Sequence, residues 1–555
     1  MDRNRWLLLV VALVAVLTLG AAGCGGDDDD DAAGGDTGGA TDEGGPAAEQ
    51  VLRIAWGAEP PSLDPGKATD TTSSNVILAL MDPLVRLNPD TLDPEASLAE
   101  SWEEEGSTVT FHLRDDATWT NGDPVTAQDF VYSWKRTLSP ELAADYAYQL
   151  YGIKGAAEYN GCTEGDCAAL ADEVAVTAVD DYTLQVELTS PQPWFIGQVS
   201  HHSFLPVHQA TVEEFGDNWT DPENIVTNGP FMLESWEHEA SINMVKNPDY
   251  RDADNVTLER IDGSIIVDGV TRVQAFEAGE VDALDGAGLP PEDIERLKQE
   301  PYYEQYPALG TYYYGFNTKN IGLDQRKAMS LAINRKIITD EIDRTGRAQA
   351  TGMTPNGIKG FDVINPNSPW LPPEGDMEAA QTSMDAEPNP KTKINLFHND
   401  APGHKEIAVA VQDMWKELGI DTTIKAQEWA QFLEFLGPPP NKAVDAYRLG
   451  WIYDFPDAIN GLELFTCDSG NNNTNWCNKD YDALVQQARE TPDDAARYEL
   501  YRQMEGVMFD EDGEVPLTPI MWYTYPNLES DAVRDTFFIS PLDQIDFTKV
   551  VVAGG

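Results

Sequence analysis

Residues 394–424 read INLFHNDAPGHKEIAVAVQDMWKELGIDTTI, and this stretch decides the fold class. It opens on an apolar run, residues 394–397, which predicts a strand. Apolar side chains then recur at helical spacing over residues 405–418, and Gly419 suits the end of a helix. Over residues 420–424 apolar and polar side chains alternate, as in a half-buried strand. Strand, helix and strand with short links predict a parallel, right-handed βαβ unit, and therefore an α/β protein.

The rest of the chain shows both helical and strand periodicity, and it contains no internal repeat. Strands are expected at 51–56, 109–113 and 516–525, with a hairpin at 174–188 around Asp180-Asp181. Helices are expected at 127–137, 324–342, 480–490 and 494–508. The run Tyr312-Tyr313-Tyr314 favours the core of a strand, with contact to a ligand as the alternative. Together these elements predict an α/β fold with mixed sheets.

The N-terminus predicts export. Residues 1–5 are basic, residues 6–19 are apolar, and small residues precede Cys24. An apolar run this short is typical of a signal peptide rather than of a spanning helix. The pattern resembles a bacterial lipobox, although Ala21 stands where leucine is usual. We therefore expect a lipoprotein signal peptide over 1–23 and a lipidated Cys24, with ordinary cleavage and a free cysteine as the alternative.

Acidic residues dominate the composition. Residues 25–50 hold nine acids and no base, so with Cys24 they are expected to form a disordered tether, 24–50, that reaches about 25–30 Å. The whole chain has 36 Lys and Arg against 96 Asp and Glu, a formal charge of −60. Such a surface repels nucleic acid and anionic lipid. Adaptation to a salty medium is one hypothesis for it.

The other four cysteines form two local pairs in the sequence. Cys162 and Cys167 enclose a four-residue loop, and Cys467 and Cys477 enclose a loop rich in Ser, Gly and Asn. In an exported protein this spacing predicts two disulfides. A zinc site is the weaker alternative, because there is no C-x-x-C motif and no histidine at ligand spacing beside these cysteines.

Catalytic motifs are absent from the sequence. It contains no G-x-S-x-G, H-E-x-x-H, P-loop or dinucleotide-binding pattern, so we expect neither an enzyme nor a cofactor. His201-His202 with His208 is the best metal candidate. Adjacent residues of a strand face opposite ways, so a structural role is the better interpretation, and no metal site is expected.

One acid lies in an unusual setting. Residues 445–457 read DAYRLGWIYDFPD, in which Trp451 and Tyr453 precede Asp454 and Pro456 prevents a helix. A carboxylate among aromatic rings is costly unless a cation or several hydrogen bonds reach it. Asp454 either caps the turn before Pro456 or accepts an ammonium group brought by a ligand.

Several blocks, in one order along nearly the whole mature chain, resemble a known family. They are FHLRDDATWTNGDPVTAQDFVYSWKR at 111–136, NIVTNGPFMLESW at 224–236, NPDY at 247–250, and residues 311–317 followed by 326–338. In these blocks the chain resembles the extracytoplasmic solute-binding proteins of family 5, which are the peptide-binding components of ABC importers. Residues 394–432 and 445–457 are most similar to the members that bind oligopeptides.

The resemblance implies a periplasmic-binding-protein-like clamp, in which two lobes close over a ligand beside an extra middle domain. The expected bounds are 51–72, 192–306 and 521–555 for the first lobe, 73–191 for the middle domain and 307–520 for the second lobe. It also implies a ligand site. Asp454 would take the α-ammonium group of a peptide, and Arg448 would meet the carboxylate of a short one. Trp451 and Trp429 would line side-chain pockets, and Tyr453 belongs to the same expected set.

Three further residues are expected at the ligand by resemblance. Tyr132 would face it from the middle domain, and Glu59 and Asn228 lie on segments expected at the cleft wall. Ile452 stands where the oligopeptide-binding members have a cysteine, so their disulfide has no counterpart here.

The implied function is capture of oligopeptides and their delivery to an ABC permease and its ATPase. The protein would be a monomer, anchored by lipid on the extracytoplasmic face of the bacterial membrane, and would bind no nucleic acid. The same scaffold with another solute, namely a metal chelate, a murein peptide or a sugar, is the alternative. A secreted enzyme is a third hypothesis.

Overall fold

The computed structural model describes residues 49–163, 165–286, 288–290, 292–365, 370–400, 403–427, 429–437, 441–467 and 469–554, with the backbone alone at 429–430. These residues belong to a compact unit over 45–555. The predicted signal peptide, Cys24 and nearly all of the acidic tether lie outside the described residues. Within the described part, no helix is long and apolar enough to cross a membrane.

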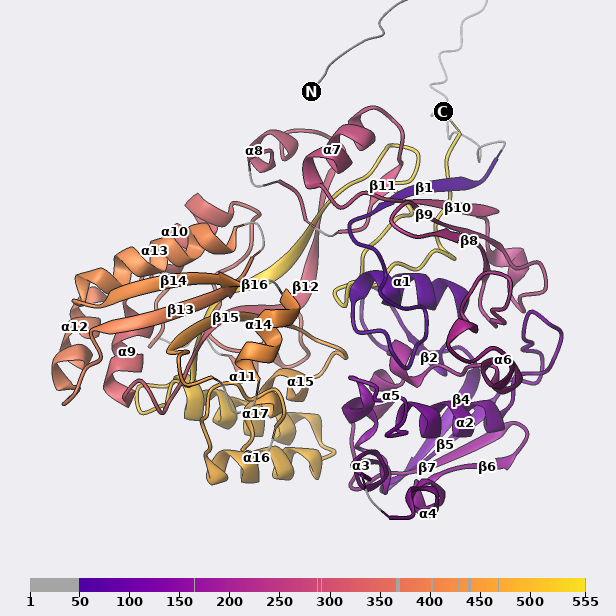
Figure 1. Ribbon diagram of the computed structural model, residues 1–555, viewed down its shortest axis with the longest axis horizontal. Helices are drawn as coiled ribbons and strands as arrows, with labels where there is room; N and C mark the ends of the chain where they lie inside the picture. The colour runs from indigo at the N-terminus through magenta and orange to yellow at the C-terminus, as the bar shows by residue number, and fades with distance from the viewer. Residues whose placement is uncertain are drawn as a thin grey trace, which may run out of the picture. The chain divides into compact units, whose positions relative to one another are not determined.

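A five-stranded mixed sheet contains the first strand of this unit, and the last residues of the unit pack in its core. Its order is β11 (Ala283–Leu284), β1 (Val51–Trp56), β10 (Arg260–Ile265), β9 (Ser241–Lys246) and β8 (Phe231–Glu237). β1 runs parallel to β10 and β11, and the other pairs are antiparallel. Its helices are α1 (Thr71–Leu80), α6 (Gln209–Phe215), α7 (Gly269–Glu277) and α8 (Ile294–Leu297). Residues 533–552 return to the core on which β1 packs, so the C-terminal segment lies near β1 (Figure 1).

A second sheet is fully antiparallel and has a core of its own. Its order is β4 (Ala99–Glu105), β5 (Thr108–Leu113), β7 (Thr183–Glu187) and β6 (Val176–Asp180), beside a ribbon of β2 (Val85–Leu87) and β3 (Pro94–Ala96). The predicted strand at 109–113 and the hairpin at 174–188 are confirmed. The helices here are α2 (Ala127–Thr137), α3 (Ala156–Asn160), α4 (Cys167–Glu173), α5 (Phe195–Gln198) and the 3₁₀ turn η1 (Ala147–Leu150).

The third sheet contains the stretch on which the sequence analysis opened. Its order is β14 (Asp421–Gln427), β13 (Lys393–Asn399), β15 (Ala446–Ile452), β12 (Tyr303–Phe316) and β16 (Leu517–Leu528). β13 and β14 are parallel and joined by α13 (His404–Glu417), so the predicted βαβ unit is confirmed. Gly419 follows the helix with a φ of +78°, a conformation that glycine adopts without strain.

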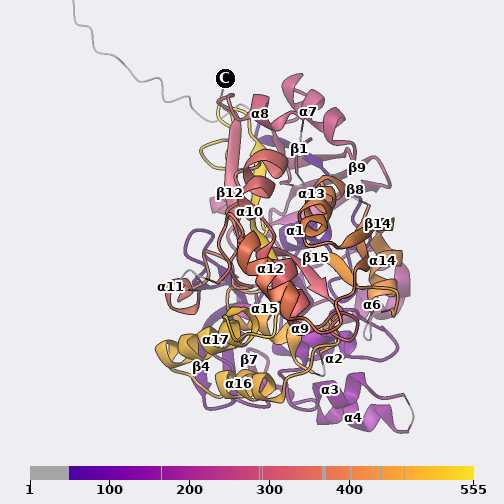
Figure 2. The same cartoon turned by 90° about the vertical axis from the view of Figure 1, so that its left-hand side faces the viewer.

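Helices cover both faces of this third sheet. One face packs on α9 (Leu323–Leu331), α12 (Met377–Ala386) and α13; the other packs on α11 (Phe361–Ile364), α14 (Trp429–Leu436), α15 (Ile459–Leu462), α16 (Lys479–Arg489) and α17 (Asp494–Phe509). Both views show α16 beside α17 (Figures 1 and 2). Tyr312 and Tyr314 lie in the first of these cores and Tyr313 in the second, which confirms the prediction of strand core.

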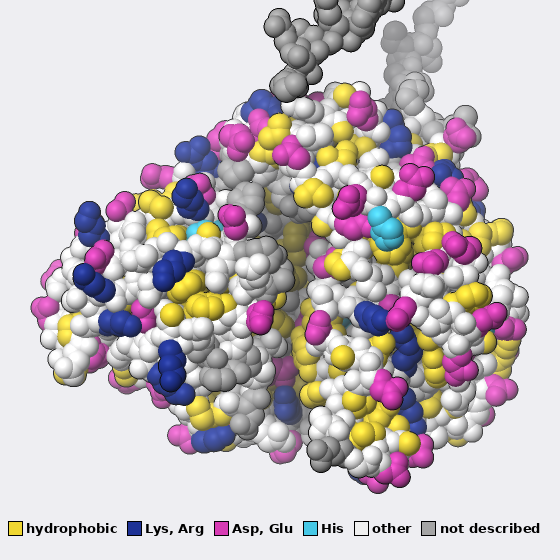
Figure 3. All heavy atoms as spheres, in the orientation of Figure 1, with side chains coloured by type: hydrophobic (Ala, Val, Ile, Leu, Met, Phe, Trp, Pro, Cys, Tyr) yellow, Lys and Arg dark blue, Asp and Glu magenta, His cyan; other side chains and the backbone are white. Residues whose placement is uncertain are grey.

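Two long strands join the first sheet's core to the third. Near their outer ends, Tyr303–Pro307 of β12 pairs with β16, and Tyr306 packs in the core of the first sheet. Beyond a register shift between Pro307 and Thr311, the same two strands enter the third sheet. A mixed α/β protein with two lobes joined in this way confirms the predicted fold class. Figure 3 shows a groove between the surface that carries α9–α13 and the surface that carries α1–α6.

Two disulfides confirm the cysteine pairing, and one helix prediction was wrong. Cys162 is bonded to Cys167, and Cys467 to Cys477. The helix expected over 324–342 ends early, because Asn334 caps a new short helix, α10 (Arg335–Ile337). The chain turns inward there so that the fully buried Arg335 can donate to the carbonyl of Pro519 at 2.7 Å.

The βαβ unit allows a matched test of core packing on one helix. Trp415 is fully buried on α13 and donates its indole N–H to the carbonyl of Met329 at 2.8 Å, whereas Val409 on the same helix is 41% exposed. We expect Trp415→Ala to lower the free energy of unfolding by about 3–5 kcal/mol, because a large cavity forms. Val409→Ala should change it by less than about 0.5 kcal/mol. Urea unfolding followed by circular dichroism measures both, and equal losses would contradict this account of the core.

Candidate functional site

Asp454 lies just beyond the C-terminal end of β15, at the centre of the third sheet. β15 runs parallel to β13, so both strands end at the same edge, where Asn399 also lies. Ligands of α/β proteins commonly bind at such an edge. Within the described residues, the carboxylate of Asp454 accepts no backbone N–H, whereas that of Asp457 accepts one from Ile459 at 3.0 Å. The turn is therefore capped by Asp457 and not by Asp454.

The two oxygens of the Asp454 carboxylate have different partners. Oδ2 accepts a hydrogen bond from the amide of Gln149 at 2.6 Å and one from the amide of Asn460 at 3.1 Å. For Oδ1 there is no comparable contact within the described part of the chain, and no Lys or Arg there forms an ion pair with Asp454. Burial raises the pKa of Asp454 to about 6, although both amide donors lower it. Among the described residues, this partly buried carboxylate therefore has no matching cation.

Asn460 connects the carboxylate to the neighbouring indole. Its Oδ1 accepts hydrogen bonds from Trp451 Nε1 at 2.8 Å and from the backbone N–H of Asp454 at 3.1 Å. Its amide nitrogen donates to Asp454 Oδ2, so one buried side chain fixes both residues. Trp451 is half-buried against the core of the third sheet. It keeps an exposed portion, as a pocket wall requires.

Arg448 lies on β15, six positions before Asp454, and it is a buried cation without a matching anion. Its guanidinium donates to Asn399 Oδ1 at 3.0 Å and to the Tyr523 hydroxyl at 2.6 Å. It also lies over the ring of Tyr312, 4.4 Å from the centroid. Nε has no partner, and no carboxylate of the described residues forms an ion pair with it. One strand and its exit thus carry two opposite charges that do not neutralise each other.

Three other predicted site residues are engaged within the protein. Tyr453 is buried, with its hydroxyl 3.4 Å from the carbonyl of Met353. The Glu59 carboxylate accepts from Trp236 Nε1 at 2.9 Å and is 2.9 Å from His238 Nδ1. Asn228 is buried and accepts the backbone N–H of Asp82 at 3.0 Å, leaving its amide nitrogen without a partner.

Two predicted site residues remain, Tyr132 and Trp429. Tyr132 is half-buried against the core of the first sheet, and burial raises the pKa of its hydroxyl. The side chain of Trp429 lies outside the described residues.

The histidine pair has a structural setting. His202 Nε2 lies 3.0 Å from the carbonyl of Ala68, and His201 Nδ1 lies 2.9 Å from Ser203 Oγ. Burial lowers the pKa of His202 to about 4, so this ring is neutral at physiological pH. His208 caps α6 by accepting from Thr211. Among the described residues, no group of three or more His, Cys, Asp or Glu could hold a metal ion.

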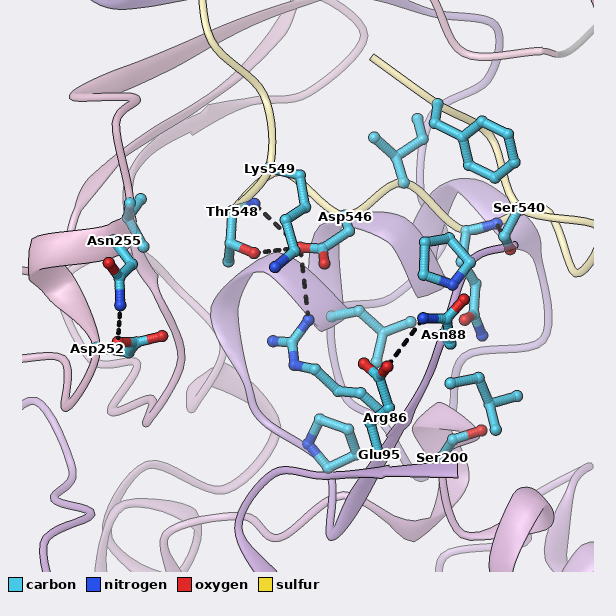
Figure 4. A pocket seen from close by; sticks show the side chains of 18 of the residues that line it. Arg86, Asn88, Glu95, Ser200, Asp252, Asn255, Ser540, Asp546, Thr548 and Lys549 are labelled. Atoms are coloured by element: carbon cyan, nitrogen blue, oxygen red, sulfur yellow. Dashed lines mark hydrogen bonds and ion pairs between the residues drawn. The ribbon is translucent and has the colours of Figure 1, made fainter. Parts of the chain in front are cut away.

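Two cavities lie elsewhere on the unit, and neither is lined by Asp454. One has a volume of about 540 Å³ and lies between the β2–β3 ribbon and the C-terminal segment. There Arg86 points toward Asp546, at 3.8 Å, and Lys549 lies beside them (Figure 4). The other has a volume of about 790 Å³ and is lined by the end of α17, by acids of the turn that follows it and by Asp480 of α16, with Trp370.

Comparison with known proteins decides the family. The family described as "Bacterial extracellular solute-binding proteins, family 5 Middle" matches residues 93–473. The chain belongs to this family. Among family 5 relatives, the oligopeptide-binding protein OppA of Bacillus subtilis is 35% identical over 544 residues, which cover 94% of this chain and 95% of that protein. The family prediction made from the sequence blocks is therefore confirmed.

Solved structures show the same two-lobed fold. OppA of Haemophilus influenzae, in complex with the peptide RPPGFSPFR, is 30% identical with a TM-score of 0.78 and covers 92% of this chain and 100% of its own. The murein tripeptide binding protein MppA of Escherichia coli is 28% identical, with a TM-score of 0.78 and the same coverage.

Sequence reasoning missed the residues that hold Asp454. Gln149 is 305 positions away in the chain, and a single glutamine in a short turn carries no signal for such a contact. Asn460 is only six positions from Asp454. Its place before Gly461 in a turn-rich segment offered a signal, because asparagine side chains commonly bond to nearby backbone in turns.

The bonds of Asn460 predict a local loss of stability. Asn460→Ala leaves the Trp451 indole and the Asp454 backbone N–H without their acceptor. We expect the free energy of unfolding to fall by about 1–3 kcal/mol, the usual cost of unpaired buried polar groups. Asn389→Ala, at an exposed position, is the control and should change it by less than about 0.5 kcal/mol. If both variants unfold at the wild-type urea concentration, Asn460 does not have this bridging role.

Proposed function

We propose that this family 5 protein binds peptides with a free N-terminus in the cleft between its lobes. The observation that carries the proposal is the carboxylate of Asp454, which is partly buried, oriented by two amides and without a cation among the described residues. A peptide α-ammonium group supplies one positive charge and three donors at a fixed end of the chain. Binding at Oδ1 would neutralise the carboxylate and set the direction of the peptide.

Arg448 gives the site its second pole. Its buried guanidinium would meet the carboxylate of a short peptide whose amino group is held by Asp454. Between the poles, the main chain of an extended ligand would pair with backbone groups of the cleft, which gives affinity without strict sequence selectivity. Trp451, Trp429 and Tyr132 would line the pockets for its side chains. We place Glu59, Asn228 and Tyr453 behind these walls as supporting residues, since each is already bonded or buried.

The transport role extends the same proposal. The protein would deliver its peptide to an ABC permease and its ATPase, as a monomer on the extracytoplasmic face of the bacterial membrane. Removal of the signal peptide, residues 1–23, would leave Cys24 as the lipid anchor and the acidic stretch up to residue 50 as the tether. We divide the remainder into a first lobe of 51–72, 192–306 and 521–555, a middle domain of 73–191 and a second lobe of 307–520. The family is one of solute-binding proteins, and we propose no enzymatic activity.

A murein peptide is the second candidate ligand. The likeness to the murein tripeptide binding protein of E. coli favours it as strongly as the OppA likeness favours linear peptides. A metal chelate or a sugar would leave both poles unmatched.

Substitution of Asp454 tests the amine receptor. Asp454→Asn keeps the shape and removes the charge, so free-amine tri- to pentapeptides should lose about 2–5 kcal/mol of binding free energy. N-acetylated forms of the same peptides should bind the variant and the wild type alike. Asp512→Asn, at an exposed position, is the control. Isothermal titration calorimetry measures all of these, and equal binding of free and acetylated peptides by the wild type would refute the assignment.

The raised pKa of Asp454 predicts how binding depends on pH. An ammonium group needs the ionised carboxylate, whose pKa in the empty protein is about 6. Below that pH binding must displace a proton, so the association constant should fall about tenfold per pH unit. Above about pH 8 it should fall again as the peptide amine loses its proton. Titration calorimetry from pH 4.5 to 9 should show both limbs for the wild type, and loss of the acidic limb in Asp454→Asn. An acidic limb that survives in this variant would assign it to another group.

A further inference from the structure

A chain of side-chain amides reaches Asp454 from the wall opposite β15. Gln149 lies in η1 and Gln198 ends α5, both within the part of the unit that contains the antiparallel sheet. Gln198 Nε2 donates to Gln149 Oε1 at 3.0 Å and to the Gln149 carbonyl at 2.9 Å. Gln149 Nε2 then donates to Asp454 Oδ2 at 2.6 Å. Both glutamines are buried, at 4% and 6% exposure, so the amides are fixed in place.

The donor from Gln198 determines which way the Gln149 amide faces. An amide has one oxygen that accepts and one nitrogen that donates. Because Gln198 Nε2 occupies Oε1, the nitrogen of Gln149 must point at Asp454. In the reverse orientation, the Gln149 nitrogen would face Gln198 Nε2 and the Gln149 oxygen would face Asp454 Oδ2, and neither pair could form a hydrogen bond. The Gln149 oxygen is therefore not available to a ligand, and its amide nitrogen is directed at Asp454.

The amides of Gln149 and Asn460 bind the same oxygen of the Asp454 carboxylate. Gln149 and Asn460 both donate to Oδ2, one from each wall of the cleft. Two strong donors on one oxygen orient the plane of the carboxylate and leave Oδ1 for another partner. Asn460 lies in α15, only six residues after Asp454, so it holds the carboxylate whether the cleft is open or closed. Gln149 comes from the other wall, so its bond exists only when the walls meet.

We propose that Gln149 is a positioning residue that orients the Asp454 carboxylate from the opposite wall and couples closure of the cleft to the readiness of the amine receptor. This inference rests on the proposed function for its consequence in binding. The contact between the walls is observed independently, since α5 also approaches the Asp454 loop: a Cβ on Gly197 would lie 3.7 Å from Pro456 Cδ. Closure would thus bring the donor that completes the receptor.

The surroundings of Asp454 define what loss of this donor would do. Glu463 faces it from its own lobe, and Tyr146 and Tyr148 face it from the wall of Gln149. Glu463 disfavours a second negative charge, and the two tyrosines are neutral because burial raises their pKa values. Gln149 and Asn460 are the groups that favour the ionised form. Removal of Gln149 should therefore shift ionisation of Asp454 to higher pH, which a merely structural role would not do.

The binding test uses trialanine and N-acetyl-trialanine as probes on the full-length protein. Gln149→Leu keeps the volume and removes the donor. Gln192→Leu is the matched control, because Gln192 lies in the same part of the protein and its amide bonds to the carbonyl of Gly152. We expect Gln149→Leu to bind trialanine about tenfold or more weakly at pH 7. The midpoint of its acidic limb should move to higher pH, while N-acetyl-trialanine binds as it does to the wild type. The control should reproduce the wild type throughout.

A second variant guards against a folding defect at position 149. Gln198→Leu leaves Gln149 in place but frees its amide to turn, so the acidic limb should move in the same direction by a smaller amount. Wild-type affinity and pH midpoint in both variants would overturn the proposal.

A measurement without ligand separates this inference from the proposed function. Small-angle X-ray scattering of the empty protein should give a larger radius of gyration for Gln149→Leu than for the wild type and Gln192→Leu, because a bond between the walls is lost. If the wild type binds neither probe, the proposed function fails, and the scattering still decides the contact. Identical scattering from all three proteins would overturn the coupling of Gln149 to closure.

Discussion

A carboxylate held away from bulk water without a cation is the constraint on which the site depends. Burial of a charge is unfavourable unless hydrogen bonds or an opposite charge compensate it. Asp454 has the hydrogen bonds, from Gln149 and Asn460, but no counter-charge among the described residues, and its raised pKa of about 6 expresses the deficit. In the function we propose, a ligand that brings an ammonium group would supply this compensation.

The scaffold explains how such a residue can be held without strain. β15 lies between β13 and β12 in a sheet that is covered by helices on both faces, so its end is rigid. The walls of the cleft, by contrast, are joined through two strands, β12 and β16, with a register shift between Pro307 and Thr311. Rigid placement of the carboxylate and a narrow connection between the lobes are complementary. In the function we propose, the first would fix one end of a ligand, and the second would allow the opposite wall to close over it.

The sequence predicted the scaffold better than the site. Strand, helix and strand at 394–424 followed from periodicity alone, because each element buries one face locally. The helix expected to Ile342 failed where Arg335 turns into the core to reach Pro519, a long-range contact without a local signal. The unusual setting of Asp454 was visible in the sequence because its aromatic neighbours are adjacent in the chain. Gln149 was not, and Glu59 was expected at the ligand although its carboxylate is engaged by Trp236 and His238.

The spacing of two unmatched charges also bears on which solutes fit. Arg448 and Asp454 are both at least partly buried, and neither has an ion-pair partner among the described residues. A neutral sugar would remove water from Arg448 and Asp454 without supplying an opposite charge to either. An anion would serve Arg448 alone and be repelled by Asp454. A zwitterion of suitable length compensates both at once, and its direction is fixed because exchanging its ends would place like charges together. The high negative charge of the chain, −60, attracts any cation but cannot distinguish among them. In the function we propose, discrimination therefore comes from the two buried poles, which would recognise the ends of a short peptide and leave its side chains largely free.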